Sequence, residues 1–366
     1  MKRLRLGVVG VGYLGSLHAQ KYAAMEDIDL VGVADIDFQR AQEVARKYHT
    51  EAYRTHNELL PHVDGLSLAV PTVSHFEVGR DILNHGKHLL IEKPIALSEV
   101  DADRLIETAE KRNITLQTGH IERFNPVVTK MKSLLSQPLL IESHRFSVFT
   151  KRGTDVDVVL DLMIHDLDII LHIVNAGVAK IDAMGMPVVS NEIDFAHVRM
   201  QFANDTIANL TASRVSNESL RTTWIFQPDS YLSVDYNKRK ISVTQFRGDK
   251  NNSIDLSPLT HQEDRFHDCD PLADQLRSFV EAMKNGTKPK VSGLDGKKAL
   301  AVALSITDQI KRRIATTLSE ANLVLYIFLL IVRWRNKYQR HLKLMDSQKV
   351  DFTLSVSILG ALKMFS

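Results

Sequence analysis

Three glycines directly after an apolar run near the N-terminus constrain the fold more than any other feature of this sequence. The run Leu4–Val9 is suited to a buried strand, and Gly10, Gly12 and Gly15 follow it at the spacing G-x-G-x-x-G. In such a turn the first glycine permits a tight bend, the second leaves room for a pyrophosphate, and the third lets the next helix pack closely on the strand. The pattern predicts a strand–turn–helix unit whose helix N-terminus faces phosphate groups.

An acidic residue supports the same prediction. Asp35 directly follows the apolar run Leu30–Ala34, about 20 residues after the glycines, where a carboxylate accepts hydrogen bonds from ribose hydroxyls. A carboxylate repels a 2′-phosphate, so the sequence favours NAD over NADP, although Arg40 lies nearby in the next helical segment. The alternative is that the glycines form an ordinary turn and Asp35 caps a helix.

Residues 1–120 alternate short apolar runs with helical patterns. Short, strongly apolar strands separated by helices indicate a parallel sheet covered on both faces. We therefore predict an α/β fold that begins with a Rossmann domain, a doubly wound parallel sheet, over residues 1–120. Its expected strands are Leu4–Val9, Leu30–Ala34, Gly65–Val70, His88–Glu92 and Thr115–Gly119, and its expected helices are 14–25, 38–48, 74–86 and 98–112.

The pattern changes after residue 121. Strand-like runs now follow one another, and the turn Ala203–Asp205 joins two of them as a hairpin. We predict a C-terminal α+β domain over 121–318 with a mostly antiparallel sheet. Its expected strands are Leu139–Val148, His197–Phe202, Thr206–Val215, Trp224–Phe226, Tyr231–Asp235 and Lys240–Phe246, and its expected helices are 158–174, 271–284 and 293–315.

Residues 319–366 fit neither domain and are predicted to form an atypical C-terminal tail. The run Leu323–Val332 is ten consecutive apolar residues, about half of what a membrane span needs. A basic cluster follows it, which would favour an anionic surface. A docked terminal helix, a tail unrelated to the fold and a membrane tether all remain open.

Charge and cysteine content exclude some classes of function. The formal net charge is only +2, so we expect no nucleic-acid partner. Cys269 is the single cysteine of the chain, which fits a reducing compartment. The N-terminus runs straight into the first strand without a secretory signal, and we expect a cytoplasmic location.

Two clusters carry the chemistry. Glu92-Lys93-Pro94 lies at the carboxyl end of a predicted strand, the edge where doubly wound sheets bind ligands. There the Lys93 ammonium would favour an alkoxide that forms as a hydride leaves. The alternative is a solvated surface lysine.

The second cluster lies on the predicted helix 158–174. Asp161, His165 and Asp168 are spaced i, i+4, i+7 and would share one helical face. His165 is suited to take a hydroxyl proton near neutral pH, with Asp161 orienting its ring. The alternative is a buried structural histidine capped by an aspartate. No third ligand stands at metal-site spacing, so no metal is predicted.

Together these features resemble the glucose–fructose oxidoreductase/inositol dehydrogenase/MocA (Gfo/Idh/MocA) family. The resemblance covers about residues 1–316, and Val70-Pro71-Thr72 with His75 looks like the family's cofactor-edge loop. It implies catalytic roles for Lys93, His165 and Asp161, and an open second sheet that builds dimers or tetramers. The expected cofactor-binding residues are Gly10, Gly12, Tyr13, Leu14, Gly15, Asp35, Pro71, Thr72, His75, Glu92 and Lys93.

Several segments resemble one subgroup of this family, the UDP-N-acetylglucosamine 3-dehydrogenases. The subgroup's features are Met163 and Val158-Val159, where many members have glycines, and the stretches 119–126, 212–214 and 225–229. The resemblance implies NAD-dependent oxidation of the sugar 3-hydroxyl, coupled to an aminotransferase in amino-sugar (lipid A-type) biosynthesis. Arg123, Asn125 and Arg214 are candidate substrate contacts, or ordinary domain-interface residues. Oxidation of another sugar or an inositol-like polyol, and a non-catalytic NAD-binding regulator, are the alternatives.

Overall fold

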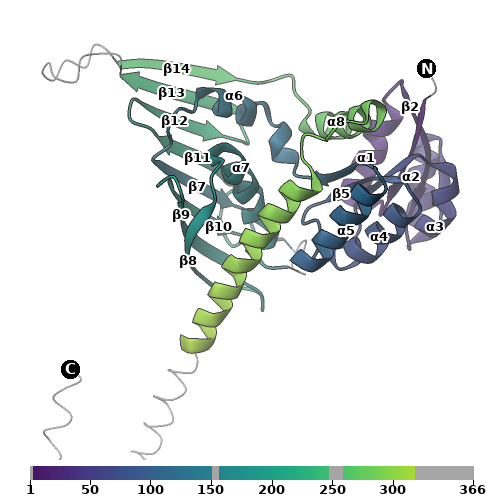
Figure 1. The fold of residues 1–366 in the computed structure, drawn as a ribbon, viewed down its shortest axis with the longest axis horizontal. Helices are drawn as coiled ribbons and strands as arrows, with labels where there is room; N and C mark the ends of the chain where they lie inside the picture. The colour runs from purple at the N-terminus through teal and green to yellow at the C-terminus, as the bar shows by residue number, and fades with distance from the viewer. Residues whose placement is uncertain (1–2, 151–155, 247–258, 318–366) are drawn as a thin grey trace, which may run out of the picture. The chain divides into compact units, whose positions relative to one another are not determined.

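A six-stranded parallel sheet forms the first part of the molecule. The computed structural model describes residues 3–150, 156–246 and 259–317 (Figure 1). The strand order is β3-β2-β1-β4-β5-β6, with every pair parallel, so the predicted doubly wound sheet is confirmed. The strands are β1 Leu4–Val9, β2 Ile28–Ala34, β3 Glu51–Tyr53, β4 Gly65–Leu68, β5 His88–Glu92 and β6 Leu116–Gly119.

Helices cover both faces of this sheet. Alternate residues of β5 point to opposite sides: Leu90 belongs to the core shared with α1 and α2, whereas Leu89 and Ile91 lie beside Gly79 of α4. Side-chain caps begin several of these helices, as where Asp37 accepts from the Arg40 amide. The helices are α1 Tyr13–Ala23, α2 Phe38–Tyr48, α3 His56–Leu59, α4 His75–Asn84 and α5 Glu99–Lys111.

The second sheet has eight strands in the order β14-β13-β12-β11-β7-β10-β9-β8. Only the pair β7–β10 is parallel, so the predicted mostly antiparallel sheet is confirmed. The strands are β7 Leu140–Phe146, β8 Val178–Met186, β9 Phe195–Phe202, β10 Ile207–Ser213, β11 Leu220–Phe226, β12 Ser230–Asp235, β13 Lys240–Phe246 and β14 Leu259–Arg265.

Three strands were missing from the sequence prediction, and all three are edge strands. β3 ends one side of the first sheet, and β8 and β14 end the two sides of the second. Edge strands are commonly short or polar, which discourages pairing with other chains. β3 has only three residues and β14 reads Leu-Thr-His-Gln-Glu-Asp-Arg. An apolar run therefore did not mark β3 or β14, and in β8 Lys180, Asp182 and Gly185 interrupt the apolar residues.

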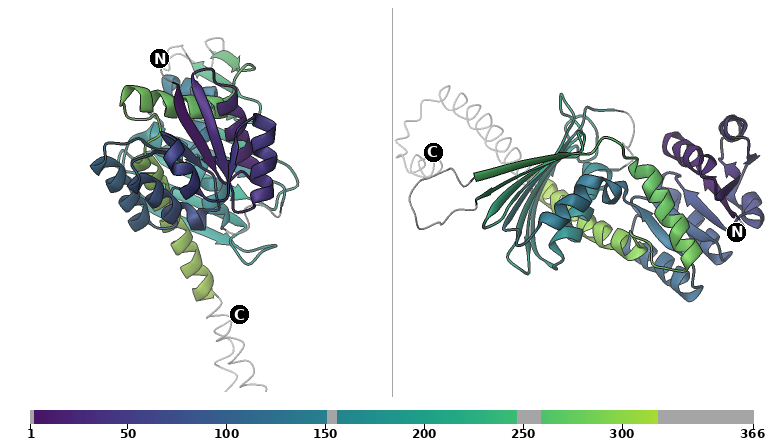
Figure 2. Two further views of the ribbon diagram at one scale, coloured as in Figure 1. Left: turned by 90° about the vertical axis from the view of Figure 1, so that its right-hand side faces the viewer. Right: turned by 90° about the horizontal axis from the view of Figure 1, so that it is seen from above.

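Helices pack on one side of the second sheet. They are α6 Pro126–Leu134 and α7 Ile164–Val174, and Figure 2 shows the sheet nearly edge-on with these helices on one side. Among the described elements, none covers its opposite face.

A further helix starts at residue 293 and is described as far as 317. No described helix combines the length and the apolar character that crossing a bilayer requires. The predicted tail, residues 319–366, lies outside the described residues.

The predicted regular helix over 158–174 is partly wrong. Residues Val159–Met163 form a wider π-helical turn, and the α-helix begins only at Ile164. The Asp161 backbone carbonyl, which an α-helix would use internally, accepts a hydrogen bond from Lys93 Nζ at 2.6 Å. Such π turns occur frequently at functional sites.

A late segment of the chain returns to the first sheet. Helix α8, Pro271–Asn285, places Leu276 and Phe279 in one apolar core with Leu6 and Tyr22. Farther along, the Thr118 amide donates to the Val291 carbonyl at 3.1 Å. Although α8 lies well beyond residue 120, its apolar face covers α1 and the first sheet.

A buried ion network joins the second sheet to its helices. Arg145 of β7 is only 1% exposed, and it donates through Nε and Nη2 to Asp166 at 2.8 and 2.9 Å. Its Nη1 donates to Glu122 at 3.1 Å. Burial alone would raise the pKa of Glu122, but the Arg145 charge and the hydrogen bonds from Asn125 and Arg145 together outweigh it, and the pKa is lowered.

We predict that Arg145→Leu destabilises the protein by about 3–5 kcal/mol, because it leaves two buried carboxylates without their counter-charge. Urea unfolding followed by circular dichroism measures the change. The control is Arg46→Leu, at an exposed position of α2, for which we expect a change within about 0.5 kcal/mol. Equal stability of the two variants would refute the structural role of the network.

Candidate active site

The glycine turn has the geometry that its sequence requires. Gly10 has φ +81°, a conformation that L side chains rarely adopt. A Cβ on Gly15 would lie 1.8 Å from the Gly10 carbonyl oxygen, so only glycine permits this close packing of α1 on the turn. A Cβ on Gly12 would meet no protein atom within 4 Å. The turn therefore presents open space beside Gly12, as a pyrophosphate site needs.

Asp35 connects this turn to the end of β2. Its carboxylate accepts from the amides of Val11 and Asp37, both at 2.9 Å. Arg40, which the sequence placed farther into the helix, has its Nη1 3.6 Å from Asp35 Oδ2. A carboxylate and a guanidinium therefore stand together at this strand end.

Exposed apolar side chains surround the same sheet edge. Tyr13, Ile36 and Val73 are 66%, 98% and 65% exposed, and they follow the carboxyl ends of β1, β2 and β4. Large exposed apolar groups gathered at one edge commonly mark a ligand site. Pro71 is exposed, and Thr72 begins the short 3-10 turn Thr72–Ser74 that holds Val73. These residues fit the flat rings and phosphates of a dinucleotide.

His75 is a buried link between two loops. Its Nδ1 lies 2.8 Å from the Pro94 carbonyl oxygen and its Nε2 lies 2.9 Å from that of Val70. Burial lowers the pKa of this imidazole, although the two carbonyls oppose the shift. His75 thus fixes the segment around the cis Lys93–Pro94 peptide relative to the loop after β4.

Glu92 lies buried beneath the site. Its carboxylate accepts from Gln275 Nε2 at 2.9 Å, and His18 Nε2 lies 3.3 Å away. Burial opposes ionisation, but His18 and Gln275 outweigh it and lower the pKa of Glu92. A Cβ on Gly119 would lie 2.3 Å from Glu92 Oε1, so Gly119 makes room for this carboxylate.

Lys93 meets the second cluster directly. Besides its bond to the Asp161 carbonyl, its Nζ lies 3.3 Å from Asp161 Oδ1. The sequence hypothesis that Asp161 orients His165 is not supported: within the described part of the chain, Asp161 bonds to Lys93 and no hydrogen bond joins it to His165. The π turn changes the spacing on which that hypothesis rested.

His165 lines the same cavity as Lys93. Its Nδ1 is buried and has no hydrogen-bond partner. Burial, followed by the positive charges of Lys93 and Arg145, lowers the pKa of His165 well below its usual value. The imidazole is therefore neutral near pH 7 and can accept a proton.

The cavity that holds both groups has a volume of about 770 Å³, and four cationic side chains line it together with three carboxylates. Arg221 and Arg239 were not foreseen. The predicted strand began at Trp224, whereas β11 begins at Leu220 and pairs Arg221 with Arg145 of β7. The polar Thr222 and Thr223 concealed this part of the strand. The lining residues are Tyr13, Leu14, Leu17, Lys21, Glu92, Lys93, Ile121, Glu122, Asn125, His165, Arg221, Tyr236, Asn237, Arg239, Asp270, Pro271 and Leu272.

The three candidate substrate contacts have different positions. Asn125 lines the cavity, but its amide donates to Glu122 and accepts from the Val127 amide. Arg123 and Arg214 do not line it. Arg123 pairs with Asp168 at 3.1 Å, and Arg214 donates to Asp194 at 2.7 Å. Both arginines are buried, so their assignment as substrate contacts is corrected to that of interior ion pairs.

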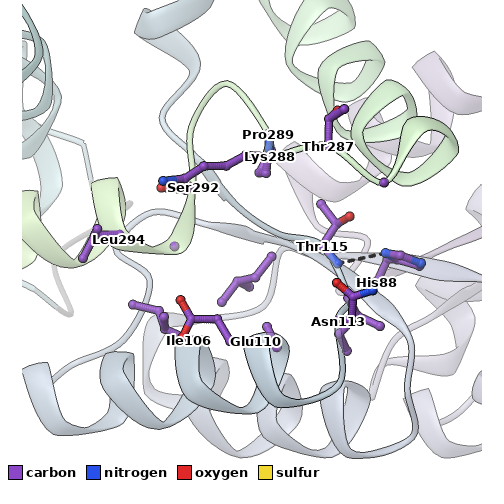
Figure 3. A pocket seen from close by; sticks show the side chains of 15 residues that line it. His88, Ile106, Glu110, Asn113, Thr115, Thr287, Lys288, Pro289, Ser292 and Leu294 are labelled. Carbon is purple, nitrogen blue, oxygen red and sulfur yellow. Dashed lines mark hydrogen bonds between the residues drawn. The ribbon is translucent and has the colours of Figure 1, made fainter.

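A separate hollow of about 460 Å³ lies at the amino ends of β5 and β6. Figure 3 shows side chains of α5, such as Ile106 and Glu110, facing the segment 286–294 across it. The Thr115 amide donates to His88 Nδ1 at its edge. None of the predicted site residues lines this hollow. The chemistry is therefore concentrated at the opposite, carboxyl edge of the sheet.

Family models match both parts of the chain. Residues 4–120 match the oxidoreductase family with an NAD-binding Rossmann fold, and residues 128–227 match the GFO/IDH/MocA C-terminal domain. A UDP-N-acetylglucosamine 3-dehydrogenase from Acidithiobacillus ferrooxidans is 36% identical over 315 residues, which cover 84% of this chain and 97% of that protein. The chain belongs to the Gfo/Idh/MocA oxidoreductase family. It is an enzyme, a dehydrogenase, as the sequence predicted.

Further relatives match this chain in sequence or in fold. The solved structure of the Acidithiobacillus enzyme has a TM-score of 0.79 at 35% identity and covers 85% of this chain and 99% of its own. A myo-inositol 2-dehydrogenase from Thermotoga maritima is 26% identical and covers 87% of this chain and 99% of its own. A levoglucosan dehydrogenase solved with NADH and L-sorbose, at 16% identity and a TM-score of 0.76, covers 85% of this chain and 98% of its own and shows the common fold.

We predict that Gly12→Ala and Gly15→Ala act differently. The Gly15 methyl would collide with backbone, so this variant loses folding stability. The Gly12 methyl meets no protein atom, so this variant keeps its melting temperature but binds NADH more weakly, because the added group fills space meant for the pyrophosphate. Thermal unfolding and NADH fluorescence titration measure the two effects. Unchanged NADH affinity of Gly12→Ala would contradict the cofactor site.

Proposed function

We propose that this enzyme oxidises the 3-hydroxyl of UDP-N-acetylglucosamine to a ketone, with NAD as the oxidant. One observation carries the proposal: Lys93 from the first sheet and a neutral His165 from the helix of the second line one cavity. The 36% identity to a UDP-N-acetylglucosamine 3-dehydrogenase supports the choice of substrate.

His165 is the proposed base. Its lowered pKa leaves the ring neutral, so it takes the proton of the substrate hydroxyl. Lys93 supplies a positive charge to the oxygen as that proton leaves, which favours the alkoxide. Asp161 is a positioning residue, because its carbonyl and carboxylate hold the Lys93 ammonium. The nicotinamide ring, when the dinucleotide is bound, supplies the hydride acceptor.

The dinucleotide is proposed to bind along the glycine turn and the apolar rim. Gly12 gives space to the pyrophosphate, and Asp35 faces the adenosine ribose. The Asp35 carboxylate disfavours a 2′-phosphate, which supports NAD, whereas the nearby Arg40 is the feature that would accommodate NADP.

The cations of the cavity are proposed to recognise the substrate diphosphate. Arg221 and Arg239 take the role that the sequence gave to Arg123 and Arg214, since guanidinium groups match phosphate oxygens well. Lys21 is paired with Asp270 at 2.7 Å and contributes less positive charge. An uncharged polyol such as inositol would need none of these arginines.

Two kinds of partner are proposed, one from the open face of the second sheet and one from the chemistry of the keto product. The open face of the second sheet carries an aromatic cluster in which His144 contacts Phe146 and Trp224, and Phe226 contacts Tyr231. A second copy of the chain is the proposed partner for this face, giving a dimer or tetramer. The 3-keto product is a substrate that an aminotransferase can convert to an amine, so we propose an aminotransferase as the next enzyme. A cytoplasmic location is proposed because a single cysteine fits a reducing compartment.

We predict that Lys93→Met and His165→Asn each lower kcat/KM by about two to four orders of magnitude. NADH formation from UDP-N-acetylglucosamine measures this, with an aminotransferase and glutamate present to consume the ketone. NADH binding should stay nearly unchanged in both variants. The control Lys111→Met, on the exposed face of α5, should keep full activity. Turnover with inositol or free sugars only would move the substrate to another class.

We predict that the acidic limb of the kcat/KM profile lies below pH 6.5, the ordinary value of histidine. Burial and neighbouring cations lower the pKa of His165, so the base stays neutral down to that lowered value. Activity is therefore present above it and is lost as the pH falls through it. Initial rates across the pH range measure the limb. An inflection at or above pH 6.5 would show that His165 is not the controlling base.

A further inference from the structure

A second cavity, of about 450 Å³, has a basic lining. It lies next to helix α6 and the end of α7, apart from the residues assigned to catalysis. Within the described part of the chain, no carboxylate lines it. Its lining residues are Arg123, Val128, Thr129, Lys132, Ser133, His172 and Lys290. We refer to it below as the α6 cavity.

Arg123 leaves a donor unused at this cavity. The side chain is 5% exposed, and its Nη1 donates to Asp168 Oδ1 at 3.1 Å. Its Nε is buried and has no hydrogen-bond partner. A buried guanidinium N–H without an acceptor is costly, so an acceptor from outside the protein would stabilise it.

Lys132 and Lys290 bring further positive charge. Among the described residues, neither has a carboxylate within ion-pair distance. Lys132 Nζ lies 3.0 Å from His172 Nε2, a contact in which the ammonium donates and the imidazole accepts. Lys290 Nζ lies 4.8 Å from the centre of the Phe124 ring.

The titration of two lining groups reflects this uncompensated charge. Burial, then Arg123 and Lys132, lower the pKa of His172 to about 4. Burial, then Arg123, lower the pKa of Lys290. Asp295 and Asp274 oppose these shifts without cancelling them. An anion in the cavity would remove the repulsion among the cations.

We propose that the α6 cavity binds a phosphate group, as a free ion or as the ester of a small metabolite. A guanidinium and two ammonium groups supply donors and charge for a multiply charged oxyanion. Thr129 also lines the cavity, and its side chain carries a neutral hydroxyl donor. The volume is within the range of small-molecule sites, so it has room for an organic group beside the phosphate.

Neighbouring residues of one turn line the α6 cavity and the active cavity. The 3-10 turn Ile121–Phe124 contributes Ile121 and Glu122 to the active cavity and Arg123 to the α6 cavity. A bound phosphate would compete with Asp168 for the Arg123 guanidinium. The proposed ligand therefore acts on the turn that forms one wall of the substrate cavity.

Calorimetric titration with inorganic phosphate, and separately with glucose 1-phosphate, tests the proposal. The full-length enzyme is first saturated with NADH and kept at constant ionic strength, so that the glycine turn is filled. We expect saturable binding of one equivalent of at least one probe. Tighter binding of inorganic phosphate would identify the free ion as the ligand, and tighter binding of the ester would identify a metabolite.

The double variant Lys132→Gln/Lys290→Gln assigns the site, and it should weaken binding by about tenfold or more, or abolish it. A control of equal net charge is Lys47→Gln/Lys111→Gln, at exposed positions of α2 and α5, which should bind as the parent does. No saturable binding of either probe, or equal affinity of the two double variants, would overturn the proposal. Both double variants keep Arg221 and Arg239 of the active cavity, so weaker binding by Lys132→Gln/Lys290→Gln alone assigns the ligand to the α6 cavity and not to the proposed diphosphate site.

Discussion

The hydrogen bond from Lys93 to the Asp161 backbone carbonyl is the contact on which the site depends. It joins the carboxyl end of β5 to the π turn before α7, two segments 68 residues apart. The bond ends on the π-helical turn Val159–Met163 and holds the ammonium beside the cavity that His165 lines. Buried contacts hold both segments in place. His75 bonds to the Pro94 carbonyl and Glu92 accepts from Gln275 next to Lys93, while Arg145 bonds to Asp166 of α7. The π turn and the lysine that bonds to it thus lie at the same point of the site.

Local patterns in the sequence were sufficient for the first sheet and its ligand edge. The glycine turn, Asp35 and Glu92-Lys93-Pro94 each follow an apolar strand, and a parallel sheet brings such strand ends to one edge. The edge strands β3 and β14 were missed because one is short and the other polar, and β8 was missed because Lys180, Asp182 and Gly185 interrupt its apolar residues. The pairing of Asp161 with Lys93 was missed because it depends on a contact between segments distant in sequence, which helical spacing does not report.

The arginines show a second limit of sequence reasoning. Arg123, Arg145, Arg214 and Arg221 have the same chemistry, and only burial and partners separate their roles. Arg145 pairs with two buried carboxylates and Arg214 with the buried Asp194, whereas Arg221 lines the active cavity, 41% exposed and 3.8 Å from Glu122. Its strand begins four residues earlier than the apolar pattern indicated. The position of an arginine relative to buried acids therefore decides whether it is available to a ligand, and this property belongs to the tertiary structure.

The return of α8 to the first sheet has a consequence for the order in which the chain folds. The apolar faces of β1, β2 and α1 share their core with Leu272, Leu276, Phe279 and Val280. During synthesis the strands of the Rossmann sheet leave the ribosome first, but the helix that seals one of its faces leaves only after the entire second sheet. The first sheet and its helices are thus incomplete through most of translation. The apolar surface of α1 stays exposed to solvent until α8 has been synthesised.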